Sequence, residues 1–265
     1  MVEATAVATA LWVRFDRAGQ VGFGRLVGDV VEVHEGDMFA GPTATGETVA
    51  LSDVELLAPT TPGKIIALWK NLRGLAEKLG QTPPDEPLYL LKASSSAIGS
   101  DATIRRPSSY GGRVVFEGEL GVVIGATCRE ATPAEAEAAI FGYTCVNDVT
   151  AADLIDKDKS FAQWARAKSF DGFGAFGPGV ATGLDPSALV IRTVLNGSER
   201  QNYPVADMFF EPAELVSRLS FDMTLEPGDL IMCGTSVGVG AMREPENIVE
   251  VTIEGVGTLR NRFVQ

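Results

Sequence analysis

The sequence predicts an α+β protein dominated by β-strands, with a small N-terminal β-rich module ahead of a larger mixed domain. Short runs of apolar residues recur through most of the 265 residues. Glycine, Pro-Gly and Asn-Gly turns separate these runs, and only three segments show the apolar spacing of a helix. A chain of this length can bury one large core, or a large core and a smaller one.

The N-terminal module is expected at residues 1–60. Strands are predicted at 11–15 and, around a Gly-Asp turn, within 20–36. The segment 40–63 has the composition of a loop, a short strand and a Pro-rich joint. We therefore place a boundary near residue 61, with the larger domain over 61–265.

The larger domain is expected to contain many strands and few helices. Strands are predicted within 63–69, 88–92, 114–125, 141–148, 188–197, 228–240 and 247–263. Asn196-Gly197 is a typical hairpin turn. Helices are predicted within 71–80, 132–142 and 211–220, the second beginning at Thr132 with acidic residues in its first turn.

Composition excludes several classes of protein. The net charge of −13 argues against a nucleic-acid partner, and no apolar run is long enough to span a membrane. The first residues include Glu3 and lack a basic segment, so no signal peptide is expected. Cys128, Cys145 and Cys233 are predicted to be buried, reduced thiols, which favours a cytoplasmic protein. His34 is the only histidine, which excludes a histidine-based zinc site.

Two acidic residues interrupt the apolar run 114–125. Because side chains alternate along a strand, Glu117 and Glu119 leave the same face, where their charges repel each other. Asp148 ends the predicted strand 141–148. Three converging carboxylates suit a hard cation such as Mg²⁺, which prefers oxygen ligands. The alternative is a solvated strand face with Asp148 capping a turn, and spacing alone does not decide between the two.

From residue 63 onward the chain resembles the fumarylacetoacetate hydrolase family. The segments that carry the resemblance occur in the family's order: GKII, LYLLKASSSAIG, FEGELGVVIG, FGYTCVNDVT, ARAKSFDGFGAFGP, VLNGSERQ, TLEPGDLI, CGTSVGVG and IEGVGTLRN. The resemblance implies a mixed β-roll of stacked sheets, a homodimer, and Mg²⁺ or Mn²⁺ held by Glu117, Glu119 and Asp148. The cation would then compensate the paired glutamates.

The resemblance also implies residues that meet the substrate. Lys168 matches the family's active-site lysine, expected near the metal and the substrate's oxyanion. Gly234 and Thr235 match the family's Gly-Thr motif near the substrate carboxylate, although a turn threonine that bonds its own backbone is a rival interpretation. Lys92 matches a family lysine to which we assign no role.

This chain departs from the pattern of the hydrolytic members at their mobile lid. Those members activate water with a histidine and a glutamate that follow the position of Asn71. Here Leu75 and Lys78 occupy the two positions, and leucine cannot take a proton. Glu77 is one position away from the glutamate and would point elsewhere on a helix.

A second departure follows Asp148. Ala152 and Ile155 stand where the family often has an arginine and a glutamine that bind substrate. The charge of the substrate must then be met by other side chains. Our sequence-based candidates are Lys70, Arg73 and Arg166.

These observations predict a divalent-metal-dependent enzyme that acts on small 2-oxo acids through a metal-stabilised enolate. The family default is carbon–carbon bond hydrolysis of an acylpyruvate or a fumarylacetoacetate-like compound, in aromatic or other carbon catabolism. The missing lid histidine favours the alternative of an isomerase, tautomerase, hydratase or decarboxylase on a related 2-oxo acid. A third possibility is a non-catalytic member that binds a metabolite, for which the retained carboxylates would have little use.

Overall fold

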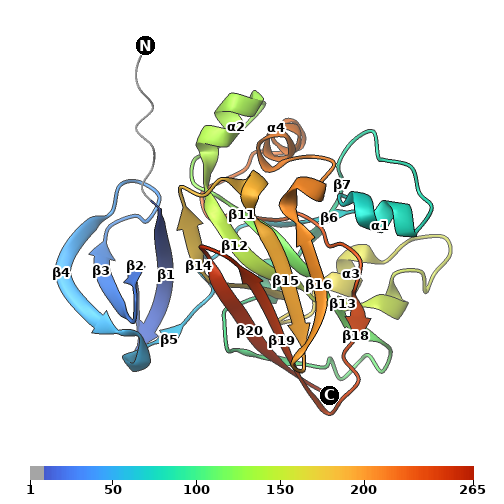
Figure 1. The fold of residues 1–265 in the computed structure, drawn as a ribbon, viewed down its shortest axis with the longest axis horizontal. Coiled ribbons are helices and arrows are strands. Elements are labelled where there is room, and N and C mark those ends of the chain that lie inside the picture. The colour runs from blue at the N-terminus through green and yellow to red at the C-terminus, as the bar shows by residue number, and fades with distance from the viewer. Residues whose placement is uncertain (1–8) are drawn as a thin grey trace.

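The computed structural model describes residues 9–265 and confirms the predicted fold class (Figure 1). Strands dominate, and the helices are short and lie at the edges of the sheets. Residues 1–8, at the start of the segment in which we expect no signal peptide, lie outside the described part. Within residues 9–265, no helix is long and apolar enough to cross a membrane.

The N-terminal module is an antiparallel meander. Its strands are β1 (Ala10–Arg17), β2 (Gln20–Val27), β3 (Val30–Glu35), β4 (Thr43–Ala50) and the short β5 (Glu55–Leu56). Val13, Phe15 and Val31 form a small core of their own. The predicted boundary near residue 61 falls between β5 and the first strand of the larger domain, and it stays a prediction.

One long sheet continues from this module into the larger domain, because β1 pairs with β14. The sheet continues through β14 (Gly174–Thr182), β12 (Ile140–Asp148), β11 (Gly118–Ile124), β17 (Leu230–Met232), β6 (Ile65–Trp69) and β7 (Leu88–Lys92). The two-residue strand β8 (Ala97–Ile98) pairs beside β14. The apolar runs predicted as strands thus form the centre of the sheet.

Two further sheets complete the roll. The larger one contains β16 (Ser198–Pro204), β15 (Val190–Leu195), β19 (Glu246–Ile253), β20 (Gly257–Val264) and β9 (Thr103–Arg105). The smaller one contains β13 (Thr150–Ala151), β10 (Val114–Phe116) and β18 (Gly240–Ala241). Fully buried side chains such as Phe116, Leu120, Ile191 and Phe263 form the main core.

The three predicted helices are present as α1 (Arg73–Lys78), α2 (Pro133–Ala139) and α4 (Pro212–Asp222). The Thr132 hydroxyl accepts from the amide of Glu135, whose carboxylate accepts from the amide of Thr132, so the predicted cap is a full capping box. Helices α2 and α4 pack together at one end of the roll (Figure 1).

The longest strand that the sequence did not predict is β14, and the one α-helix not predicted within residues 9–265 is α3 (Trp164–Lys168). The β14 segment GAFGPGVAT contains glycines and a proline, which predict turns rather than a central strand. Close packing explains one of these glycines. A Cβ at Gly179 would lie 2.5 Å from the carbonyl oxygen of Trp12 on β1, so only glycine lets the two strands approach.

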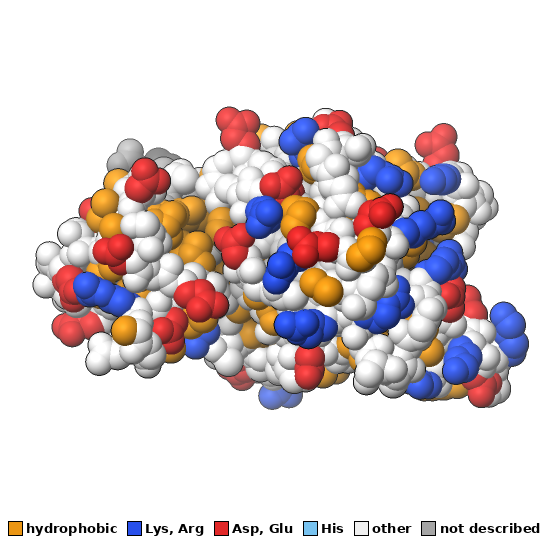
Figure 2. All heavy atoms as spheres, turned by 90° about the horizontal axis from the view of Figure 1, so that it is seen from below, with side chains coloured by type: hydrophobic (Ala, Val, Ile, Leu, Met, Phe, Trp, Pro, Cys, Tyr) orange, Lys and Arg blue, Asp and Glu red, His pale blue; other side chains and the backbone are white. Residues whose placement is uncertain are grey.

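Charged side chains of both signs mix over the surface. On the face shown in Figure 2, lysines and arginines lie among acidic side chains over the larger domain, and no continuous basic face is visible there. The three cysteines are free and buried, as predicted. Burial raises the pKa of the Cys145 thiol to about 12, so this group is unreactive at neutral pH.

Asn71 fixes the chain that leads into α1. Its side-chain amide donates to the carbonyl oxygens of Cys233 (3.0 Å) and Phe210 (3.3 Å), and its oxygen accepts from the Phe210 amide (3.0 Å). The residue is only 1% exposed. We expect Asn71→Ala to lower the free energy of unfolding by about 2–4 kcal/mol, because buried backbone groups lose their partners.

Urea unfolding of this variant and of Asn202→Ala tests the expectation. Asn202 is exposed and its side chain makes one long hydrogen bond, to Glu199 (3.4 Å). Equal stability of the two variants would contradict the structural role of Asn71.

Candidate active site

The pairing of β11 with β12 brings the predicted metal ligands together. Glu119 lies opposite Val146, and Gly118 lies opposite Asn147. Glu117 sits between β10 and β11, where its carbonyl oxygen accepts from the amide of Asp148 (2.8 Å). One carboxylate oxygen from each of Glu117, Glu119 and Asp148 lies within 4.8 Å of the others. The strand face inferred from the E-x-E spacing therefore meets the end of β12.

Burial makes this cluster unfavourable without a compensating charge. Glu119 and Asp148 are completely buried, and the Glu117 side chain is 14% exposed. Burial, together with the charges of Asp148 and Glu117, raises the pKa of Glu119 well above its ordinary value. The Gly234 amide donates to Glu119 Oε2 (2.8 Å). Glu119 Oε1 is buried and has no hydrogen-bond partner in residues 9–265.

Two lysines supply part of the compensation. Lys168 Nζ donates to Glu117 Oε2 (2.9 Å), Asp148 Oδ2 (2.5 Å) and Thr150 Oγ1 (2.7 Å). Lys92, to which the sequence analysis gave no role, donates to Asp148 Oδ1 and to the Phe173 carbonyl (2.9 Å). Burial acts to raise the pKa of Asp148, but the two ammonium groups outweigh it and hold that pKa below its ordinary value.

The cluster fits a divalent cation. Its donors are carboxylate oxygens, which hard cations such as Mg²⁺ and Mn²⁺ bind in proteins. Glu119 Oε1 is a free acceptor within the cluster. The lysines approach Glu117 and Asp148 and leave Glu119 to the Gly234 amide. The protein's own groups therefore leave the charge of Glu119 incompletely compensated at Oε1, where a cation could bind.

Thr235 lies near the cluster, but its hydroxyl forms hydrogen bonds with other protein groups. It donates to the Gly118 carbonyl (2.9 Å) and accepts from Gln201 (2.8 Å). Gly234 has φ +91°, a left-handed conformation that glycine adopts without strain, and this turns its amide toward Glu119. The hydroxyl therefore bonds the backbone of a different strand and not that of its own turn, which differs from the rival interpretation, and the Gly234 amide bonds a predicted metal ligand.

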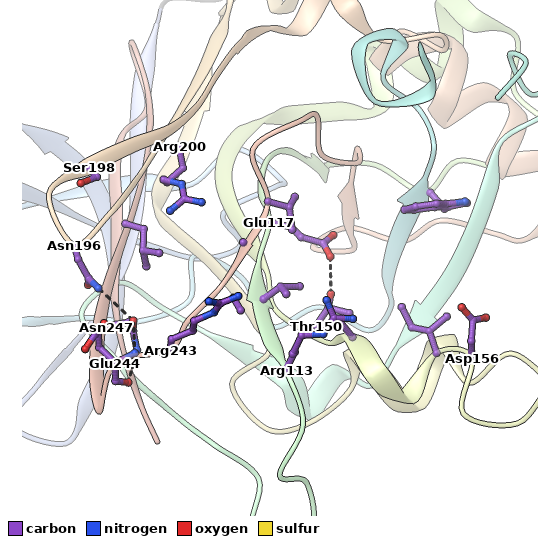
Figure 3. A pocket seen from close by; sticks show the side chains of 18 of the residues that line it. Arg113, Glu117, Thr150, Asp156, Asn196, Ser198, Arg200, Arg243, Glu244 and Asn247 are labelled. Atoms are coloured by element: carbon purple, nitrogen blue, oxygen red, sulfur yellow. Dashed lines mark hydrogen bonds between the residues drawn. The ribbon is translucent and has the colours of Figure 1, made fainter. Parts of the chain in front are cut away.

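Glu117 opens onto a cavity of about 960 Å³ (Figure 3). The three-stranded sheet contributes Val115 from β10, with Thr150 and Ala241 opposite it on the neighbouring strands, and Glu117 follows directly after β10. One part of the wall is apolar and aromatic, and another carries arginines. The apolar side chains are Trp69, Ala152, Ile155 and Trp164, and the arginines are Arg113, Arg200 and Arg243.

The sequence-based candidates for substrate charge do not line this cavity. Lys70, Arg73 and Arg166 are absent from its wall, and Arg73 instead lies over the ring of Phe209. Alternation along the strand could have indicated Arg113, which is four residues before Glu117 on the same face. No local pattern indicates Arg200 or Arg243, because they reach the cavity from distant segments, β16 and the loop after β18.

The lid positions carry no acid–base group toward the cavity. Leu75 is partly buried and packs against the main core. Glu77 and Lys78 are exposed on α1 and neither lines the cavity. His34 lies on β3, where its ring contacts Trp12 edge-on at 4.9 Å between centroids. Within residues 9–265, therefore, no histidine replaces the lid histidine.

A family model described as fumarylacetoacetate (FAA) hydrolase C-terminal matches residues 64–264. The chain belongs to the fumarylacetoacetate hydrolase family. A second family model, described as Rv2993c-like, N-terminal, matches residues 11–59. Divalent metals are common in the family, and the Glu117, Glu119 and Asp148 cluster is present here.

Relatives of this family member carry out different reactions. The Bacillus subtilis oxaloacetate tautomerase YisK is 35% identical, over 81% of this chain and 74% of the relative. A 2-hydroxyhepta-2,4-diene-1,7-dioate isomerase from Mycobacterium marinum matches at TM-score 0.87 and 35% identity, covering 97% and 98% of the two chains. A fumarylpyruvate hydrolase from Pseudomonas aeruginosa, solved with Mn²⁺ and pyruvate, matches at TM-score 0.72 and 26% identity, covering 79% and 91%.

Proposed function

We propose that this protein is a divalent-metal-dependent tautomerase or isomerase of small 2-oxo acids. The reaction moves a proton from C3 of the substrate to a base, either water or one of the cavity carboxylates Asp156 and Glu244, and a proton returns to oxygen or to carbon. The observation that carries the proposal is the Glu117, Glu119 and Asp148 cluster with Lys168, next to a cavity that neither Leu75 nor Lys78 of the lid positions lines. The tautomerase and isomerase relatives support this choice.

Glu117, Glu119 and Asp148 would hold Mg²⁺ or Mn²⁺. A cation bound there supplies a Lewis acid that favours loss of the C3 proton by drawing electron density toward the 2-oxo group. Lys168 holds a positive charge at Nζ beside the same carboxylates, where it can stabilise the negative charge that develops on the substrate oxygen. Thr150 orients that ammonium group by accepting from it.

Hydrolysis of a carbon–carbon bond is the second candidate, because one structural neighbour is a fumarylpyruvate hydrolase. That reaction needs a group that takes a proton from the attacking water. Leu75 cannot do so, and Lys78 is exposed outside the cavity. Asp156 and Glu244 line the cavity wall and are the carboxylates available for that role.

NMR in D₂O distinguishes the two candidates. Oxaloacetate and acetylpyruvate are incubated with the enzyme, with and without Mg²⁺, and against enzyme-free controls. We expect Mg²⁺-dependent exchange of the C3 protons without bond cleavage. Acetate and pyruvate from acetylpyruvate would establish hydrolysis instead, and pyruvate with CO₂ from oxaloacetate would establish decarboxylation. Absence of exchange with both compounds would contradict the proposal.

A further inference from the structure

The cavity has an apolar wall directly beside the carboxylate cluster. Trp164 lies four residues before Lys168 on α3, so both side chains lie on the same helix face one turn apart. The ring of Trp164 contacts that of Trp69, at the end of β6, with 5.2 Å between centroids. Both indole rings line the cavity and are partly exposed to it. An aromatic surface is thus available to a substrate held near Lys168.

The two departures from the family pattern extend the same wall. Ala152 and Ile155 both line the cavity where an arginine and a glutamine would otherwise meet the substrate. Ala152 follows Thr150, the residue that bonds Glu117 and Lys168, by two positions. Asp156 lines the cavity next to Ile155, and Figure 3 shows it on the side of Glu117 away from Arg200 and Arg243. A second carboxylate on this side would face Asp156, and the charge of Arg113 is already paired with Asp153 (2.8 Å).

We propose that the substrate is a 2-oxo acid with an apolar, preferably flat, substituent that packs against Trp69 and Trp164. This inference rests on the proposed enolisation at the carboxylate cluster and names its substrate class. The 2-oxo acid group lies at the cluster, and the substituent extends over Ile155 and Ala152. Removing an aromatic or aliphatic substituent from water against such a wall favours binding, whereas burying a second carboxylate there is unfavourable.

Two arginines of the cavity could instead bind a substrate that carries a second carboxylate. Arg200 and Arg243 have no hydrogen-bond or ion-pair partner in residues 9–265, and both are exposed. A second carboxylate reaching them would make the enzyme prefer dicarboxylates. Neither arginine contacts Lys168, Glu117 or Asp148, whereas Trp164 shares a helix face with Lys168. The apolar wall is therefore the surface that shares a structural element, α3, with the carboxylate cluster's lysine.

The test is a comparison of two probes in the C3 exchange assay, 2-oxo-4-phenylbutanoate and 2-oxoadipate, with the Mg²⁺-loaded enzyme. We expect kcat/KM for the phenyl compound to be higher, by roughly tenfold or more. The ratio of the two values should fall in Trp69→Ala. It should also fall in the double variant Ala152→Arg, Ile155→Gln, which restores the polar pair. Trp12→Ala, in the N-terminal module, is the matched control and should leave the ratio unchanged.

The outcomes separate this inference from the function on which it rests. Exchange with both probes but a preference for 2-oxoadipate, lost in Arg200→Gln, would overturn the apolar substrate class and keep the enolisation. An equal effect of Trp69→Ala on both probes would also overturn it, because the indole would then act on folding or on the cluster. Absence of exchange with every 2-oxo acid would overturn the proposed function and this inference together.

Discussion

Replacing Glu119 by Gln is expected to reduce C3 exchange on the order of 10³-fold. The variant removes one negative charge from the cation site, and Lewis-acid stabilisation contributes several kcal/mol, with each 1.36 kcal/mol equal to a factor of ten. The fold should survive the change. The glutamine oxygen can accept from the Gly234 amide as Glu119 Oε2 does, and its amide can donate to the neighbouring carboxylates.

Stability measurements separate loss of the cation from loss of the fold. In metal-free buffer, Glu119→Gln should unfold at a urea concentration equal to or higher than the wild-type protein, because a buried charge without full compensation has been removed. Glu137→Gln, the same change at an exposed position on α2, is the control and should leave turnover unchanged. Full turnover in Glu119→Gln would rule out its role as a ligand.

Replacing Lys168 by Met is expected to reduce turnover on the order of 10²-fold while cation affinity stays equal or increases. The first effect follows from losing a preorganised positive charge beside the reacting oxygen. The second follows because the ammonium group and the cation bind the same carboxylates, Glu117 and Asp148. Methionine has a similar length, so packing changes little.

The same variant should be less stable than the wild-type protein when no cation is present. Glu117 loses its ion-pair partner and Asp148 keeps only Lys92, and breaking a buried ion pair costs about 3–5 kcal/mol. Added Mn²⁺ should restore much of that stability. Isothermal titration with Mn²⁺ and thermal unfolding check both points, with Lys157→Met as the exposed control. Wild-type turnover in Lys168→Met, or loss of Mn²⁺ affinity alongside turnover, would contradict this account.

The strands of this fold were predictable because their signals are local. Apolar runs between glycine turns gave the positions of β6, β7, β11 and β12, and Thr132 gave the start of α2. The strand β14 was not predictable in this way. Its glycines serve contacts with other strands, such as the approach of Gly179 to Trp12, and such contacts leave no periodic pattern in the sequence.

Some residues of the candidate site could also be predicted from local sequence signals, and others could not. Glu117 and Glu119 stand out because charges interrupt an apolar strand, and Asp148 stands out at the end of another. The contact of Lys92 with Asp148, and the positions of Arg200 and Arg243 at the cavity, come from pairings between distant segments. Ala152 and Ile155 were visible as departures from a family pattern, but only the cavity shows that they adjoin Trp69 and Trp164.

We propose that Glu117, Glu119 and Asp148 together hold one divalent cation. Electron paramagnetic resonance measures it directly, because the signal of free Mn²⁺ falls as the ion binds to protein. Titration of the metal-free wild-type chain should remove one equivalent of Mn²⁺ per chain from solution, and titration of Glu119→Gln should remove none. Equal binding by the two proteins, or no binding by the wild-type protein, would contradict the account.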